Sequence, residues 1–260
     1  MAHAEKILTY GAAGILVTSG SLLQFAGSQD RSAPRGIVSA VQSDMNLRSS
    51  ENGERLLGRR EVEWTLVAPE FPRPPACPGP SNLYRVNLPS NLMAGEYSNT
   101  KQVRVPAQVA LLSKGAPATC SDPEPIGDLE LVTDGEKNYE DGYCVDLIPG
   151  SQWVQIDLGE TREVHLVWLW MGYKYATLSY KDILIRISDD PSFAQAETVF
   201  NNDHDNSSGM GAGTDPAWIE TNFGHPVSVK GARGRYVRLY SNGKNLDETN
   251  QWIEVEVYGR

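Results

Sequence analysis

The sequence of 260 residues contains only three cysteines, and no two of them are spaced C-x-x-C. The low count excludes a disulfide-dense small scaffold and a zinc site made of four thiolates. The spacing excludes a thioredoxin-like redox motif and covalent haem attachment. Outside the cytoplasm one disulfide can form, and the sequence allows Cys120 to pair with either Cys77 or Cys144.

The signature motifs of common enzyme classes are also missing. The chain has four histidines, no H-E-x-x-H and no G-x-S-x-G, and no phosphate-loop lysine follows its glycine-rich run at 209–213. We therefore predict a protein that is not an enzyme. The net charge is −10, and residues 107–260 hold 12 Lys and Arg against 24 Asp and Glu. Because an acidic domain repels phosphate backbones, nucleic acid is not expected as a partner.

One long stretch without charge runs from Ile7 to Gly27. At about 1.5 Å per residue it is just long enough to cross a bilayer core of ~30 Å. The stretch exceeds the ~7–15 residues of a signal-peptide core, and its glycines allow close helix contacts. We therefore predict a transmembrane anchor within residues 1–30, with a cleaved signal or a soluble helix or arm as alternatives. The residues predicted to mark the span are Ile7, Gly11, Gly14, Leu16, Gly20, Leu23 and Phe25.

Proline is concentrated in one segment of residues 31–106. Six prolines lie between Pro69 and Pro80, a composition that favours polyproline II and excludes the interior of a sheet. The alternation of Glu61–Val67 predicts one strand, and apolar residues are too few for a separate core. We predict an extended, proline-rich arm that acts as a spacer or lies on a partner.

From residue 107 onward, apolar and polar residues alternate in several short runs separated by loops rich in Gly, Asn and Asp. In one of these runs, Val164, Leu166, Trp168 and Trp170 share a face. Repeated period-2 segments without long helix patterns predict a mainly β fold, an antiparallel β-sandwich or jelly roll, over 107–260. The predicted strands are 153–158, 164–170, 183–187, 235–240 and 252–258.

Four of the stretches in 107–260 resemble the coagulation-factor-5/8 type C (discoidin-like) domain in its bacterial form. They are Leu131–Gly135, Gln152–Gly159, Arg235–Leu239 and Ile253–Gly259. The resemblance implies an eight-stranded jelly roll that binds glycans, lipid head groups or proteins through loops at one end, usually without catalysis. Eukaryotic members often join the domain ends by a disulfide, and this chain has no cysteine after Cys144.

The resemblance also implies a structural calcium ion between an Asp-Gly loop and a glutamate of the last strand. The matching residues are Asp134 and Glu256. Calcium suits such a site because it takes several oxygen ligands, many of them from loops. The alternative is that Asp134 caps a turn and that Glu256 is a solvated strand residue.

The polar loop at 201–209 is a second candidate for calcium. Asp203, Asp205 and Ser207 occupy alternate positions, as oxygen ligands do at the start of a calcium loop. The loop is not an EF-hand, since glycine comes one position late and Thr214 replaces the bidentate glutamate. A polar loop that hydrogen-bonds to itself is the alternative.

Aromatic residues in predicted loops or at strand ends offer a ligand surface. Such rings stack on sugars or form protein interfaces, and packing within the domain is the alternative. The candidate ligand residues are Tyr139, Tyr143, Tyr173, Tyr175, His204 and Trp218.

Two functions follow from these features. The first is a membrane-anchored, extracytoplasmic (periplasmic or cell-surface) accessory subunit that stabilises a larger membrane complex, for example a photosynthetic or respiratory one. The alternative is a secreted or surface carbohydrate-binding protein, with a glycan as its partner.

Overall fold

The computed structural model describes residues 62–75, 85–175 and 177–260, which lie within one compact unit from Gly58 to Arg260. The predicted transmembrane anchor and Cys77 lie outside the described residues. Within the described ranges, no helix is long and apolar enough to cross a membrane.

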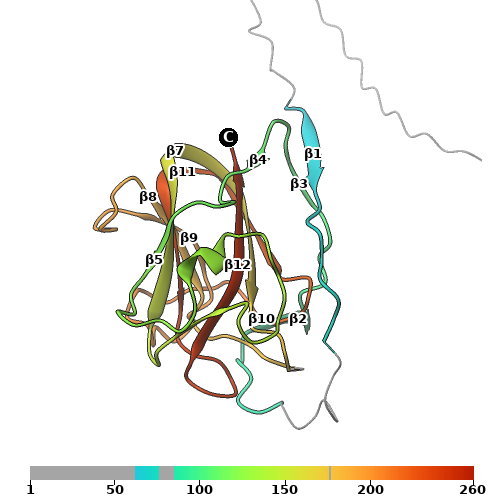
Figure 1. The fold of residues 1–260 in the computed structure, drawn as a ribbon, viewed down its shortest axis with the longest axis vertical. Coiled ribbons are helices and arrows are strands. Elements are labelled where there is room, and N and C mark those ends of the chain that lie inside the picture. Colours follow the sequence, from blue (N-terminus) through green and yellow to red (C-terminus); the bar gives the residue numbers. More distant parts are fainter. Residues whose placement is uncertain (1–61, 76–84, 176) are drawn as a thin grey trace, which may run out of the picture. The chain divides into compact units, whose positions relative to one another are not determined.

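The described chain is almost entirely β-structure (Figure 1). A short 3-10 helix, η2 (Leu129–Val132), is the only helical element of the described residues. The strands are β1 (Trp64–Val67), β2 (Leu92–Tyr97), β3 (Val103–Pro106), β4 (Ala110–Leu111), β5 (Ala118–Cys120), β6 (Val145–Leu147), β7 (Gln152–Met171), β8 (Leu184–Ser188), β9 (Glu197–Asn201), β10 (Ala217–Ile219), β11 (His225–Ser241) and β12 (Asn250–Gly259).

The main sheet has the strand order β4-β12-β7-β11-β8-β9, with β5 added to β7 and β6 added to β12. All of its pairings are antiparallel, whereas β10 and β2 form a separate parallel pair. The prediction of a mainly β, antiparallel fold is therefore confirmed.

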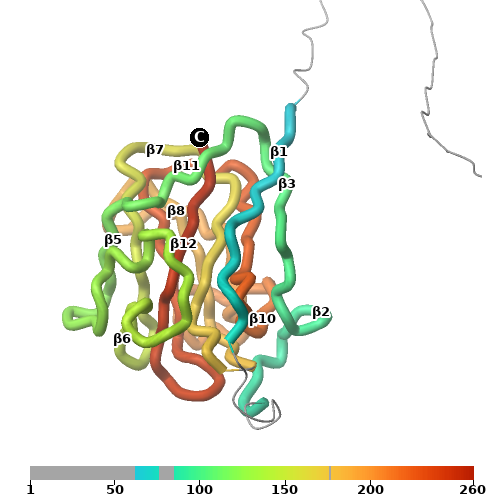
Figure 2. Tube along the Cα trace, turned by 45° about the vertical axis from the view of Figure 1, so that its right-hand side comes forward, coloured from blue at the N-terminus to red at the C-terminus, as the bar shows by residue number. Residues whose placement is uncertain are grey.

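Strands β7 and β11 are long enough to take part in two layers (Figure 2). They pair along most of their length, with register shifts between Ser228 and Ala232 and between Gly234 and Tyr236. Glycine is needed at position 234, because a Cβ there would lie 2.6 Å from Cγ2 of Ile187. Each strand bends at these shifts, so that its two halves belong to opposite layers.

The main hydrophobic core lies between these layers. Val154 and Ile156 from the first half of β7 are fully buried in it, together with Val167 and Leu169 from the second half. The two halves of one strand therefore supply both walls of the core, which is the arrangement of a β-sandwich.

One face of β7 differs from the sequence pattern. Val164 lies in the main core, whereas Leu166, Trp168 and Trp170 belong to a second cluster on the opposite face of the strand. In the pairing with β12, Leu166 lies opposite Tyr258 and Val164 opposite Gly259, so β7 has one extra residue at this point. A bulge of this kind rotates the side chains that follow it, and simple alternation does not reveal it.

The second hydrophobic cluster lies beneath the N-terminal arm (residues 62–106, described at 62–75 and 85–106). Val67 of β1 and Val105 of β3 are buried against Trp168 and Trp170, and the ring centroids of Phe71 and Trp168 are 5.7 Å apart. The described part of the arm thus covers the outer face of its own sheet, and the predicted division near residue 107 separates two parts that pack together.

Candidate functional site

Five strand ends meet at one end of the sandwich. β7 ends at Met171, β9 at Asn201 and β11 at Ser241, while β8 begins at Leu184 and β12 at Asn250. Leu184 pairs with Asn201, and the Ser241 hydroxyl donates to Oδ1 of Asn250 at 2.7 Å. The loops between these strands therefore share one surface.

A cavity of about 100 Å³ opens in this loop surface. Segments on both sides of the β8–β9 pair line it, together with the 87–91 segment of the arm. Most of its lining residues are polar or charged, although apolar atoms make up the larger part of the surface that faces the space. A small, partly apolar cavity bordered by hydrogen-bonding side chains suits a ligand with several hydroxyl groups. Among its lining residues are Lys181, Asp182, Asn202, His204, Asp205 and Ser207.

Three carboxylates gather at the cavity. Asp182, Asp203 and Asp205 each offer an oxygen, and these oxygens lie within 4.8 Å of one another. Asp182 and Asp203 are buried, while Asp205 is exposed. The sequence pattern identified Asp203 and Asp205 but missed Asp182, which enters from the loop before β8. Such an oxygen cluster is compatible with calcium, and calcium at this loop stays a prediction.

Ser207 serves as a hydrogen-bond donor within this cluster. Its hydroxyl donates to Oδ2 of Asp182 at 2.6 Å, and its backbone N–H donates to Oδ1 of Asp203 at 3.0 Å. The N–H of Ser208 donates to the second oxygen of Asp203, also at 3.0 Å. The loop thus contains the internal hydrogen bonds that the sequence offered as the alternative to a calcium site.

Asn202 lines the cavity and holds a buried amide donor that has no hydrogen-bond partner among the described residues. Its Oδ1 accepts the backbone N–H of Ile183 at 2.7 Å, which fixes the orientation of the amide. Its Nδ2 is buried and has no hydrogen-bond partner among the described residues. Such a group costs roughly 1–3 kcal/mol. The carboxylates of Asp182 and Asp205 line the same cavity as Asn202.

Three of the six predicted ligand residues pack within the domain. The Tyr173 hydroxyl is buried and donates to the carbonyl of Lys137 at 2.6 Å. Trp218 is buried and stacks on His225 with ring centroids 3.8 Å apart. Tyr139 packs against Tyr173, with ring centroids 5.5 Å apart. These three aromatic side chains do not line the cavity.

The other three predicted ligand residues are at least partly accessible. Tyr143 is exposed and Tyr175 is half-buried, and neither lines the cavity. His204 is exposed and lines it, and its Nε2 lies 3.2 Å from the hydroxyl of Ser90 in the arm. Of the six residues, the structure brings only His204 to this cavity.

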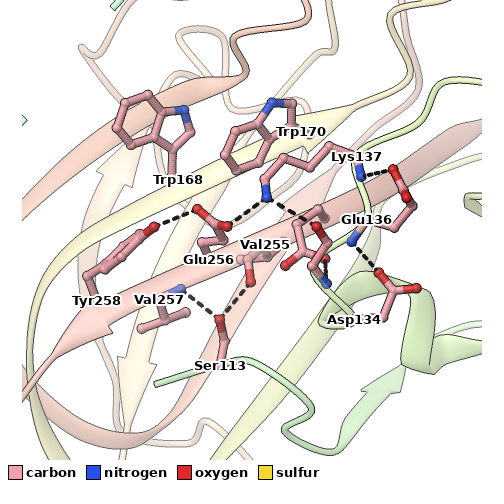
Figure 3. A network of polar contacts seen from close by, with 12 residues as sticks. Ser113, Asp134, Glu136, Lys137, Trp168, Trp170, Val255, Glu256, Val257 and Tyr258 are labelled. Carbon is pink, nitrogen blue, oxygen red and sulfur yellow. Dashed lines mark hydrogen bonds and ion pairs between the residues drawn. The ribbon is translucent and has the colours of Figure 1, made fainter. Parts of the chain in front are cut away.

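The predicted calcium site between Asp134 and Glu256 contains a lysine (Figure 3). Oε1 of Glu256 pairs with the Lys137 ammonium at 2.8 Å, and Oε2 accepts the Tyr258 hydroxyl at 2.7 Å. Oδ1 of Asp134 accepts the N–H of Glu136 at 2.7 Å, as a turn cap does. Because an ammonium group already lies on Glu256, the residues as arranged here do not fit a calcium ion.

Glu254, two residues earlier on β12, belongs to the same site and was missed in the sequence. Its side chain is 1% exposed, and its Oε2 accepts the N–H of Gly135 at 3.0 Å. Burial raises the pKa of Glu254 to about 8, against the opposing effects of this N–H group and of Lys137. Alternation places Glu254 and Glu256 on the outer face of β12, and no signal in the sequence shows that the arm covers that face.

Cys120 and Cys144 do not form the disulfide that the sequence allows. Both thiols are free, and they pack against different hydrophobic clusters on opposite faces of the sheet. The thiol of Cys120 donates to the carbonyl of Asp122, and the sulfur of Cys144 accepts from Nε2 of Gln251. Burial raises the pKa of both thiols. The pairing with Cys77 lies outside the described residues.

No protein-family model and no curated protein matches the sequence, but solved structures resemble the chain. Chitosan-binding module 1 of a chitosanase/glucanase from Paenibacillus sp. IK-5 is 20% identical with a TM-score of 0.42, over 58% of this chain and 99% of that one. The family 32 carbohydrate-binding module of Clostridium perfringens NanJ, in complex with galactose, is 12% identical with a TM-score of 0.44, over 58% and 98%. The family 32 module of AlyQ, in complex with 4,5-unsaturated mannuronic acid, is 20% identical with a TM-score of 0.40, over 54% and 92%. At these identities the likeness concerns the fold alone.

Proposed function

We propose that the described domain is a non-catalytic carbohydrate-binding module that acts outside the cytoplasm and takes its ligand in the cavity at the loop end of the sandwich. The observation that carries the proposal is the set of polar side chains around the cavity: Asp182, His204 and Asp205 line it, and His204 and Asp205 are exposed. A sugar hydroxyl both donates and accepts hydrogen bonds, so neighbouring hydroxyl groups satisfy such a wall.

The size of the cavity limits the ligand. Pockets for drug-sized molecules measure roughly 300–1,000 Å³, whereas this cavity measures about 100 Å³. It therefore accommodates the hydroxyl groups of one terminal sugar residue, with the rest of a glycan outside. Its position on loops, with a rigid sheet behind them, is typical of binding sites.

The predicted role in a membrane complex stays a prediction, because the hydrophobic segment on which it depends lies outside the described residues. An extracytoplasmic location is part of the present proposal, since a glycan-binding module meets its ligand there.

The test is a glycan-array screen with the full-length protein, followed by calorimetry on the glycans that it retains. We expect His204→Ala and Asp205→Ala each to weaken binding about tenfold, because a lost hydrogen bond is worth about 1–1.5 kcal/mol. Both residues are exposed, so the fold is expected to tolerate the changes.

Asp141→Ala is the matched control, because Asp141 is an exposed aspartate that pairs with Lys174 at 2.8 Å and does not line the cavity. This variant is expected to bind like the wild-type protein. An array that retains no glycan, or equal affinity of all three variants, would refute the proposal.

A further inference from the structure

We propose that the ammonium group of Lys137 is a built-in replacement for a structural divalent cation between the 134–137 loop and the last strand, so that this junction is stable without calcium. The inference is independent of the carbohydrate-binding proposal. It concerns Lys137, Glu254 and Glu256, which lie away from the ligand cavity and beneath the arm.

The ammonium group has the surroundings of a bound cation. It lies 2.8 Å from Oε1 of Glu256 and 3.3 Å from the carbonyl oxygen of Gly135. Its Nζ also lies over the ring of Trp170, 4.9 Å from the ring centre. Lys137 is 7% exposed and Glu256 is 4% exposed. A buried carboxylate, a loop carbonyl and an aromatic face thus surround one positive charge (Figure 3).

The backbone holds Lys137 in position from both sides. Its N–H donates to Oε1 of Glu136 at 2.9 Å, and its carbonyl accepts the hydroxyl of buried Tyr173 at 2.6 Å. The Lys137 side chain is therefore directed from a fixed anchor toward β12. A covalently attached cation that is pre-positioned in this way loses little further freedom when it pairs with Glu256.

The site places one ammonium group on one carboxylate and holds a second carboxyl group, that of Glu254, nearby. Glu254 has one oxygen bonded to the N–H of Gly135, and its other oxygen is buried without a partner among the described residues. Lys137 and Glu256 form an ion pair with no net charge. Without the lysine, two buried carboxylates and the Gly135 carbonyl would remain, and this is a set of hard oxygen ligands suited to a divalent cation.

An ion can reach this position from a neighbouring cavity. A space of about 430 Å³ lies between residues 69–72 of the arm and the network, and Gly135, Lys137, Glu256 and Tyr258 line it. Shortening Lys137 to alanine would connect the carboxylates with this space.

The experiment compares the thermal unfolding midpoint of the full-length protein in millimolar calcium and in EDTA. We expect the wild-type midpoint to be the same in both conditions. Lys137→Ala is expected to unfold at a lower temperature in EDTA and to gain at least about 5 °C in calcium, the shift expected when calcium exceeds its Kd about a hundredfold. Lys114→Ala is the matched control, because Lys114 lines the same cavity without an ion pair among the described residues.

The whole series is repeated in an Asp205→Asn background. This change weakens calcium binding at the carboxylate cluster of the loop end, so that a remaining shift in the unfolding midpoint reports on the junction of Lys137 and β12. Calcium stabilisation of the otherwise wild-type protein that persists in this background would overturn the proposal. A folded Lys137→Ala variant without calcium dependence would also overturn it. If Lys137→Ala does not fold in either condition, Lys137→Ser, which leaves a hydroxyl ligand, is refolded with and without calcium, and equal yields would contradict the proposal.

Discussion

Trp168→Ala is expected to lower the free energy of unfolding by about 3–5 kcal/mol, the usual cost of removing a fully buried tryptophan. Its ring is completely buried and lies between Trp170 and Phe71, with centroid distances of 5.9 and 5.7 Å. Its indole N–H also donates to the carbonyl of Phe223 at 2.8 Å. The substitution therefore removes a central side chain of the second cluster and its ring contact with Phe71 of the arm.

Urea denaturation gives the free energy, and hydrogen exchange tests where the loss occurs. Amide protection in β1 and β3 is expected to fall in Trp168→Ala, because these strands depend on the second cluster. Trp64→Ala is the control, since Trp64 is 50% exposed on β1 and its ring contacts the Arg104 guanidinium at 4.9 Å, and its effect should stay within about 1 kcal/mol. A loss below about 1 kcal/mol for Trp168→Ala would mean that the arm contributes little to stability.

The strands of the sandwich were predictable because their periodicity is local. Four of the five predicted strands of 107–260 lie inside strands β7, β11 and β12, and the fifth overlaps β8. The division between Val164 and Leu166 was not predictable, because it depends on a register shift in the pairing of β7 with β12. The contacts of the arm were not predictable either. Val67 and Val105 lie in short apolar stretches that are too small for a core of their own, and only the sheet beneath them makes them part of one.

The site residues show the same limit. Asp203 and Asp205 were identifiable because they are neighbours in one loop. Asp182 was not, because its approach depends on the pairing of β8 with β9. Glu254 and Glu256 alternate with core valines and therefore look like solvated residues. Their burial results from the arm and from Lys137, both of which are distant in the sequence.

Stability is expected to fall as the pH rises from about 6.5 to about 8, because two buried carboxyl groups hold protons in the folded state. Burial raises the pKa of both Glu254 and Glu220 to about 8, from 4.5. The folded protein therefore keeps protons that the unfolded chain releases, and the stability present below pH 4.5 is lost as the pH rises through 8. Each group contributes a slope of up to about 1.4 kcal/mol per pH unit.

The fall in stability is predicted from pH 6.5 upward, because below pH 6.5 the ionisation of His225 changes the stability in the opposite direction. Burial lowers the pKa of its imidazole to about 3, from 6.5. The stability that the neutral imidazole contributes is therefore complete above pH 6.5 and is lost as the pH falls toward 3. Glu254→Gln keeps the shape and the acceptor for the N–H of Gly135 but cannot ionise. Denaturation between pH 6.5 and 8 should therefore show about half the wild-type slope, and Glu220→Gln should remove the other half. Parallel curves for wild-type protein and Glu254→Gln would mean that Glu254 is already ionised in the folded protein at pH 6.5, and the pH dependence assigned to its buried proton would then be wrong.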